Sequence, residues 1–175
     1  MSGLSERVEL RDYDPSWAEI FEAERIVIAP IFDGRAVGIE HIGSTSVPYL
    51  CAKPIVDVLV GLRELSLSQE DIGAMEDLGY EYMGEFGLPG RLYFRKGDPR
   101  THHVHVVEHG GDHWERQLLF RDALRTDPDE RKRYDAFKRQ LAAAGHPREI
   151  YTELKTPFIR EVEARARARG VRASA

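Results

Sequence analysis

The feature that most constrains the fold of this chain is an almost unbroken apolar run at residues 53–60, Lys-Pro-Ile-Val-Asp-Val-Leu-Val. Apolar and β-branched residues at successive positions are typical of a central strand that is covered on both faces. One charge, Asp57, interrupts the run. A carboxylate in an apolar strand is costly unless it is paired or binds a metal, so Asp57 is a candidate site residue. A structural Asp57, paired with Lys53 or an arginine, is the alternative.

The rest of the pattern predicts a helix, a strand-rich middle and three final helices. Asp14 and Pro15 begin the first predicted helix, which runs to about Ile31. Alternation and turn residues predict further strands at 36–42, 80–83, 91–96 and 101–108. Helices are predicted at 68–78, 112–125, 128–144 and 147–169. We therefore expect an α+β fold, a mixed β-sheet flanked by helices, with a helical C-terminal part.

Length and composition indicate a single domain without a membrane partner. The chain has 175 residues, which predicts one domain over residues 1–170 and a flexible tail at 171–175. No apolar run approaches the roughly 18 residues of a membrane span, and the N-terminal residues lack the apolar core of a signal peptide. The one cysteine, Cys51, cannot pair within its own chain. These features predict a cytoplasmic location.

Charge is distributed unevenly along the chain. Up to Gly111 there are 10 Lys and Arg against 19 Asp and Glu, whereas from Asp112 onward there are 15 against 11. A basic C-terminal half could face phosphates, but arginine and glutamate that alternate on helices are more typical of a solvated surface. Nucleic acid is therefore not a leading partner.

A phosphate site is indicated where the strand at 36–42 ends. Gly43 would let backbone amides approach a phosphate closely, and Ser44 would add a hydroxyl donor. A carboxylate on the adjacent strand, Asp57, could hold a divalent cation against that phosphate. The spacing by itself is common in turns, so the setting of Asp57 carries this interpretation.

Histidines form the second constellation. Residues 102, 103, 105, 109 and 113 supply five of the chain's seven histidines. Residues two apart on a strand share a face, so His103 and His105 point together. With Asp57 they would make a three-ligand site, and imidazole suits Zn, Mn or Fe better than Mg. The alternatives are phosphate donors, general acid or base groups such as His105, or surface residues of the strand.

Three segments carry a resemblance to a known family: residues 40–48, 52–57 and 101–107, which read EHIGSTSVP, AKPIVD and THHVHVV. In type and order they resemble the signature segments of the GrpB family, a branch of the nucleotidyltransferase superfamily with the polymerase-β-like fold. The resemblance extends from Val8 to about Glu161. It implies a mixed sheet with the Gly-Ser turn and the strand carboxylate at one end. GrpB-like domains also occur fused to dephospho-CoA kinases, which implies a nucleotide or a coenzyme A-related small molecule as ligand.

The resemblance also exposes a departure. In the wider superfamily the strand carries two acidic residues separated by one position, and here the second position is Leu59. Glu40 or the histidines could supply the missing ligand, or the site could lack it altogether. We expect a mixed site of Asp57, His103 and His105 that prefers Mn or Zn, whereas a site completed by Glu40 would favour Mg.

Basic residues are candidates for holding phosphates. Arg91 lies on a predicted strand with Tyr93 and would face a phosphate if that face were shared with the Gly-Ser turn. Lys155 shares a helix face with Tyr151, and the family resemblance favours its pointing into the cleft. Lys53, at the start of the central run, is the third candidate.

The residues together predict a metal-dependent nucleotidyltransferase-like protein that acts on a nucleoside triphosphate and an unknown small-molecule acceptor. A nucleotide- or cofactor-binding module that has lost catalysis is the second hypothesis, because of Leu59. A metal-dependent phosphoester hydrolase built on Asp57, His103 and His105 is the third.

Overall fold

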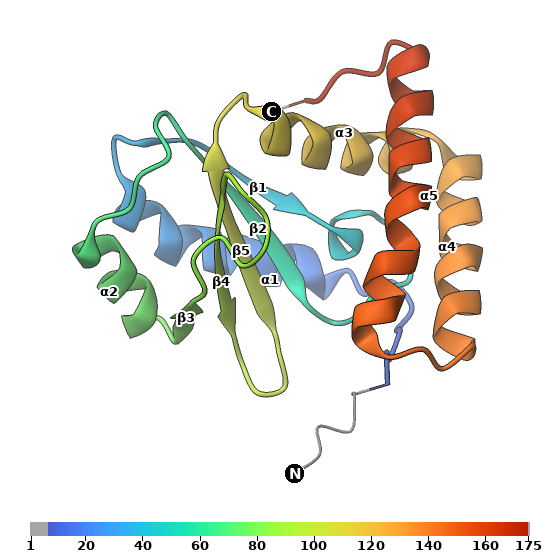
Figure 1. The fold of residues 1–175 in the computed structure, drawn as a ribbon, viewed down its shortest axis with the longest axis horizontal. Helices are drawn as coiled ribbons and strands as arrows, with labels where there is room; N and C mark the ends of the chain where they lie inside the picture. The colour runs from blue at the N-terminus through green and yellow to red at the C-terminus, as the bar shows by residue number, and fades with distance from the viewer. Residues whose placement is uncertain (1–6, 175) are drawn as a thin grey trace.

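The computed structural model describes residues 7–174 and has the predicted order of elements (Figure 1). Five strands form one sheet, and helices lie on both of its faces, so the α+β prediction with a helical C-terminal part is confirmed. The strands are β1 Ala36–Ile42, β2 Val56–Leu62, β3 Tyr80–Tyr82, β4 Arg91–Lys96 and β5 His102–Glu108. The helices are α1 Ser16–Ile28, α2 Gln69–Asp77, α3 Asp112–Thr126, α4 Pro128–Ala143 and α5 Arg148–Ala168.

The sheet has the order β1-β2-β5-β4-β3. β2 and β5 are parallel, and the other neighbouring pairs are antiparallel. β2 therefore lies inside the sheet, as its apolar sequence predicts. In the register of the pairs, Asp57 is opposite both Ile42 of β1 and His103 of β5.

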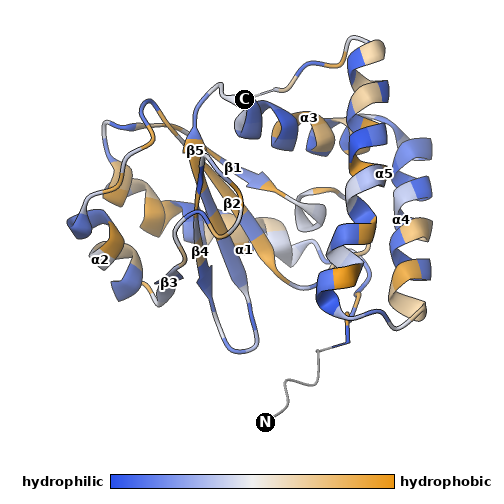
Figure 2. Ribbon diagram, viewed as in Figure 1, coloured by the Kyte–Doolittle hydropathy of each residue, from blue (hydrophilic) through white to orange (hydrophobic). Residues whose placement is uncertain are grey.

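One face of the sheet has an apolar centre and is covered by α1 and α2 (Figures 1 and 2). Alternate residues of β2 and β5, among them Val58 and Val104, pack there with no exposed surface. Polar residues of the same face contact α1, among them His41, stacked on Phe21, and Lys96, paired with Glu24. Ser68 caps α2 through a reciprocal capping box with Asp71, which fixes where that helix begins. The alternation of side chains along a strand therefore separates a core face from the face that carries Asp57.

On the other face, α3 covers only part of the sheet. The Trp114 ring lies against Gly38 of β1 and Gly61 of β2. A Cβ atom on Gly61 would lie 2.6 Å from the ring, so glycine is required for this close approach. Because α3 docks at that end of the strands, the opposite end, with Asp57 and His103, stays open to a cavity.

The C-terminal helices complete the wall of that cavity. α4 and α5 pack against each other and against α3 around a cluster that includes Leu50, Tyr134 and Val162. Figure 1 shows the three helices gathered on one side of the sheet, with α1 and α2 on the other. The first strand of the chain leads into this cluster through the turn at residues 43–50.

Two element boundaries differ from the predictions by about three residues. The first α-helix ends at Ile28 and continues as a 3₁₀ turn, Ala29–Phe32, because Pro30 has no N–H to donate to the helix. The central strand begins at Val56 rather than Lys53, and Ala52 forms an isolated bridge with Arg11 instead.

The end of the chain contacts α3. Ser174 donates hydrogen bonds to Asp122 through its backbone N–H and its hydroxyl. The flexibility expected for residues 171–175 stays a prediction, and residue 175 lies outside the described residues. Over residues 7–174, no helix combines the length and the apolar character that crossing a bilayer requires.

Candidate functional site

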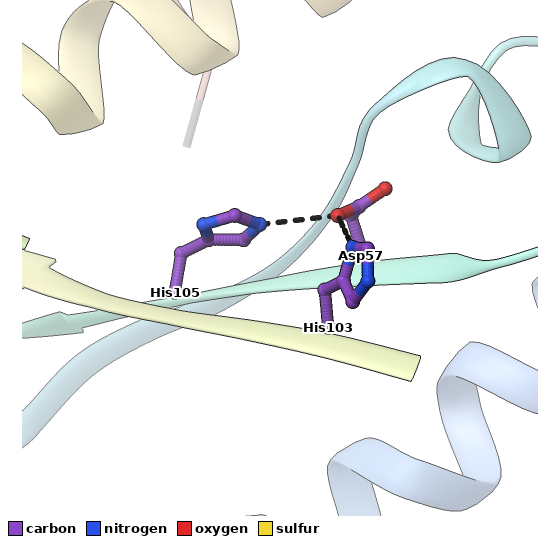
Figure 3. A group of neighbouring side chains, drawn as sticks. All are labelled: Asp57, His103 and His105. Carbon is purple, nitrogen blue, oxygen red and sulfur yellow. Dashed lines mark hydrogen bonds and ion pairs between the residues drawn. The ribbon is translucent and has the colours of Figure 1, made fainter. Parts of the chain in front are cut away.

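Asp57, His103 and His105 converge on the open face of the sheet (Figure 3). His103 Nδ1 and His105 Nε2 both donate to Oδ1 of Asp57, at 3.2 Å and 3.0 Å. One possible ligand atom from each residue lies within 4.8 Å of the others. The parallel register of β2 and β5 brings Asp57 beside His103, and the two-residue period places His105 on the same face. The expected juxtaposition of these three residues is therefore confirmed.

The electrostatics of this triad suit a cation. Burial opposes the ionisation of Asp57, yet the hydrogen bonds from His103 and His105 hold its pKa below the ordinary value. Burial lowers the pKa of His105, which favours the neutral imidazole. One carboxylate beside imidazole nitrogens is a donor set for a first-row divalent metal.

The Gly43-Ser44 turn packs directly on this triad. Gly43 has φ +70°, and a Cβ atom there would lie 2.7 Å from Oδ2 of Asp57. Both the left-handed backbone and the close contact therefore require glycine. Ser44 begins a short 3₁₀ turn, and its Oγ accepts a hydrogen bond from Nζ of Lys138 at 2.8 Å.

A cavity of about 520 Å³ joins the triad to the C-terminal helices. Ser44 and Asp57 both line it, as expected for residues at the ends of neighbouring strands. Its cationic lining residues include Lys53, Lys138, Arg148 and Lys155. The cavity therefore has a carboxylate and two imidazoles at the sheet, and a cationic end where Lys138, Arg148 and Lys155 of α4 and α5 line it.

The lysines of this cavity are desolvated. Burial lowers the pKa of Lys138 to about 8 and the pKa of Lys155 to about 7, with neighbouring cations adding to the effect. Burial also lowers the pKa of Lys53. An anion bound among them would restore their charged forms.

Lys138 is a site residue that the sequence reasoning missed. It is 2% exposed, and its Nζ donates to Ser44 and to the backbone oxygen of Cys51. A signal was available, because Lys138 lies four residues after Tyr134 on the apolar face of α4. A lysine is rarely buried on such a face unless its ammonium group has partners. Arg148, at the start of α5, was also missed.

Two of the candidates lie elsewhere. Oε2 of Glu40 accepts from Nη1 of Arg121 at 2.7 Å, because Glu40 pairs with Leu59 and lies one strand repeat away from Asp57. Arg91 is not among the residues that line the cavity. The loop before β4 folds back over its guanidinium, which donates to the backbone oxygens of Glu85 and Phe86.

Two further residues that the sequence singles out, Leu59 and Cys51, have clear surroundings in the structure. Leu59 is fully buried with Trp114 and Leu118 of α3, so an apolar contact occupies the position of the second acidic residue in the superfamily. Cys51 is fully buried, and burial raises the pKa of its thiol to about 11, which agrees with a packing role rather than a nucleophile.

Comparison with known proteins identifies the family. The family model described as GrpB protein matches residues 7–165, nearly the whole chain. The chain belongs to the GrpB family. The crystal structure of the conserved protein GrpB from Enterococcus faecalis superimposes with a TM-score of 0.80 at 43% identity, covering 90% of this chain and 96% of that one. The family resemblance is therefore confirmed, and the nucleotidyltransferase superfamily placement is consistent with it.

Among curated GrpB relatives, the UPF0157 protein YqkA of Bacillus subtilis is 42% identical over 164 residues, which are 92% of this chain and 48% of YqkA. This chain thus spans about half the length of that relative. A dephospho-CoA kinase of Mycolicibacterium paratuberculosis is 27% identical, with 91% of this chain matching 46% of the kinase.

Proposed function

We propose that this GrpB protein is a metal-dependent nucleotidyltransferase that binds a nucleoside triphosphate in the cavity and transfers its nucleotidyl group to a small-molecule acceptor. The observation that carries the proposal is the arrangement of one cavity, in which a carboxylate-histidine triad adjoins the Gly43-Ser44 turn and a cluster of lysines. A triphosphate needs both a bound cation and several positive side chains. This cavity has candidate ligands for the cation and several lysines.

The donor set fits a single first-row cation. Asp57, His103 and His105 would hold it through one oxygen and two nitrogens, which favours Mn²⁺ or Zn²⁺ over Mg²⁺. A two-metal site does not fit, because Leu59 replaces the second carboxylate and Glu40 is paired with Arg121. When bound, the cation would neutralise charge on the phosphate that reacts.

The remaining site residues would bind and orient the triphosphate. Ser44, held by Lys138, would donate to a terminal phosphate oxygen, while Lys53 and Lys155 would neutralise the phosphate chain. If Asp57 and His103 alone held the cation, His105 would be the candidate general base for an acceptor hydroxyl. Catalysis would come mainly from position and charge neutralisation.

The dephospho-CoA kinase relative adds one element to the proposal. Since a GrpB-like segment forms part of a protein with that name, a coenzyme A-related nucleotide is included among the ligands to be tested. The proposal keeps the cytoplasmic location that the sequence predicts.

Phosphoester hydrolysis is the second candidate function. Two histidines and one carboxylate resemble the ligand sets of single-metal hydrolytic sites. In that case water rather than an acceptor would attack the phosphorus.

Calorimetry with each nucleoside triphosphate in turn, with Mn²⁺ present, tests the proposal. We expect Asp57→Asn to weaken cation-dependent binding by at least about tenfold, because a ligand is lost while the volume hardly changes. Asp77→Asn, an exposed carboxylate on α2 across the sheet, is the matched control and should bind like the parent protein.

Mass spectrometry of the reaction products separates the two functions. A nucleotidyl adduct on an acceptor with release of pyrophosphate supports transfer, whereas release of phosphate without an adduct supports hydrolysis. Triphosphate binding that never leads to turnover would leave a binding module. If Asp57→Asn bound the triphosphate as tightly as the parent protein with Mn²⁺ present, the metal site would be overturned.

A further inference from the structure

Most of the few lysines of this arginine-rich chain line the cavity. There are 5 lysines, at positions 53, 96, 132, 138 and 155, among the 25 Lys and Arg residues. Three of the five, Lys53, Lys138 and Lys155, line this one cavity. A guanidinium holds phosphates at least as well as an ammonium, but only an amine can lose its proton near neutral pH. The distribution therefore indicates that the chemistry of an amine, beyond its charge, is used here.

Lys155 is one of two lysines of this cavity, with Lys53, whose amines face the Tyr151 ring. Its Nζ lies 4.8 Å from the centre of the Tyr151 ring. Lys138, in contrast, donates to Ser44 and to the backbone oxygen of Cys51. Lys53 lies over the same ring, at 5.3 Å.

We infer that Lys155 is a covalent site for phosphorylated carbonyl compounds, forming an imine with an aldehyde or ketone whose phosphate lies against Ser44 and Lys138. The nitrogen lone pair of Lys155 attacks the carbonyl carbon, and the oxygen takes up a proton. The carbinolamine then loses water as the C=N bond forms. No oxidant or reductant is needed, and the reaction reverses by hydrolysis.

The surroundings of Lys155 support this reactivity. Burial and the nearby ammonium groups lower its pKa to about 7, so much of the amine is uncharged at neutral pH. The charged groups whose fields act on it are Lys53 from the segment before β2, Asp57 from β2, Lys138 from α4 and Arg148 from α5. Three of these four are cations, and an adjacent cation is one of the devices that activates a lysine nucleophile.

Imine formation goes beyond nucleotidyl transfer and does not require the metal. Both activities would use the cationic end of the cavity, so a triphosphate and a phosphorylated aldehyde should compete there. A volume of about 520 Å³ is within the range of pockets that hold one small ligand.

Pyridoxal 5′-phosphate is a suitable probe, because it carries a phosphate and an aldehyde and its imine absorbs visible light. The whole protein is incubated with the probe and a metal chelator, reduced with borohydride and mapped by peptide mass spectrometry. We expect the adduct on Lys155, with formation rising as the pH passes about 7. Lys155→Arg keeps the charge but cannot form an imine, and should reduce adduct formation at least about tenfold.

The controls separate a built site from general lysine labelling. Lys132→Arg, an exposed lysine on α4, should label like the parent protein. Pyridoxal without its phosphate should label far less, and inorganic tripolyphosphate should protect Lys155. Labelling spread over all five lysines, or retained in Lys155→Arg, would overturn the inference. Since neither metal nor nucleotide is present, failure here leaves the proposed function intact, and the reverse also holds.

Discussion

The two faces of the sheet are built from alternate residues of the same strands and differ in what covers them. Val58 and Val104 face α1 and α2 with no exposed surface, whereas Asp57 and His103, one residue earlier in each strand, face the cavity. The covered face has a continuous apolar centre, which stabilises the fold. The other face is covered by α3 at one end only, which leaves room for polar groups. Neighbouring residues of β2 therefore have different roles: Val58 packs in the core that stabilises the fold, and Asp57 belongs to the candidate site.

The largest effect should come from moving a carboxylate to the covered face. Val58→Asp would bury a charge in an apolar cluster without a partner, and should lower the free energy of unfolding by about 4 kcal/mol or more. Denaturant unfolding checks this, with Asp57→Asn as the matched change on the other face. If both variants were equally stable, the distinction between the faces would be wrong.

A smaller effect is expected where α3 meets the open face. Gly61→Ala would place a Cβ atom 2.6 Å from the Trp114 ring, and the overpacking should cost about 1–3 kcal/mol. Gly73→Ala, in α2 with nothing within 4 Å of the new atom, should instead stabilise the protein by about 0.5–1 kcal/mol. Thermal unfolding of the two variants compares them, and shifts of the same sign would contradict the role of Trp114.

The cavity should bind anions more weakly as the pH rises. In the free protein the pKa values of Lys155 and Lys138 are lowered to about 7 and about 8, so both ammonium groups lose protons above these values. An anion favours the charged forms, and binding must then take up protons. Sulfate, whose charge is constant here, should lose up to about tenfold in affinity between pH 6.5 and 8.5.

Calorimetry in two buffers of different ionisation enthalpy measures this proton uptake directly. Lys155→Met should lose part of the uptake as well as part of the affinity. Sulfate affinity that is independent of pH, with no proton taken up, would show that these lysines do not hold the anion.

The smallest effect concerns Arg91, which the sequence had placed among the phosphate ligands. Its guanidinium is held by the loop before β4 and does not line the cavity. Arg91→Ala should therefore change pyrophosphate affinity, measured by calorimetry, by less than about twofold. A loss as large as that of Lys155→Ala would return Arg91 to the site.

Much of the secondary structure follows from local pattern. The bounds of β1 and β4 agree with their predictions, and α3, α4 and α5 begin and end within a residue or two of theirs. The apolar run also places β2 inside the sheet. Local pattern works here because strand alternation, capping residues and proline act over a few neighbouring residues.

The site was only partly predictable for the same reason. Asp57, His103 and His105 were found because one is a lone charge in an apolar strand and the others are separated by one position. Lys138 was missed because its partner Ser44 is 94 residues away in sequence. Arg121 of α3, which engages Glu40 across 81 residues, was equally out of reach.

By itself, the sequence determined the alternation that gives β2 an apolar face and a face with one carboxylate, and the two-residue spacing that puts His103 beside His105. Only the tertiary structure decided that α3 buries Leu59, that Arg121 takes Glu40, and that α4 and α5 bring Lys138 and Lys155 to the triad. The physical reason is the distance along the chain over which each effect acts. Side-chain direction is set by the dihedral angles of neighbouring residues, whereas the partners of a charge depend on how distant helices pack.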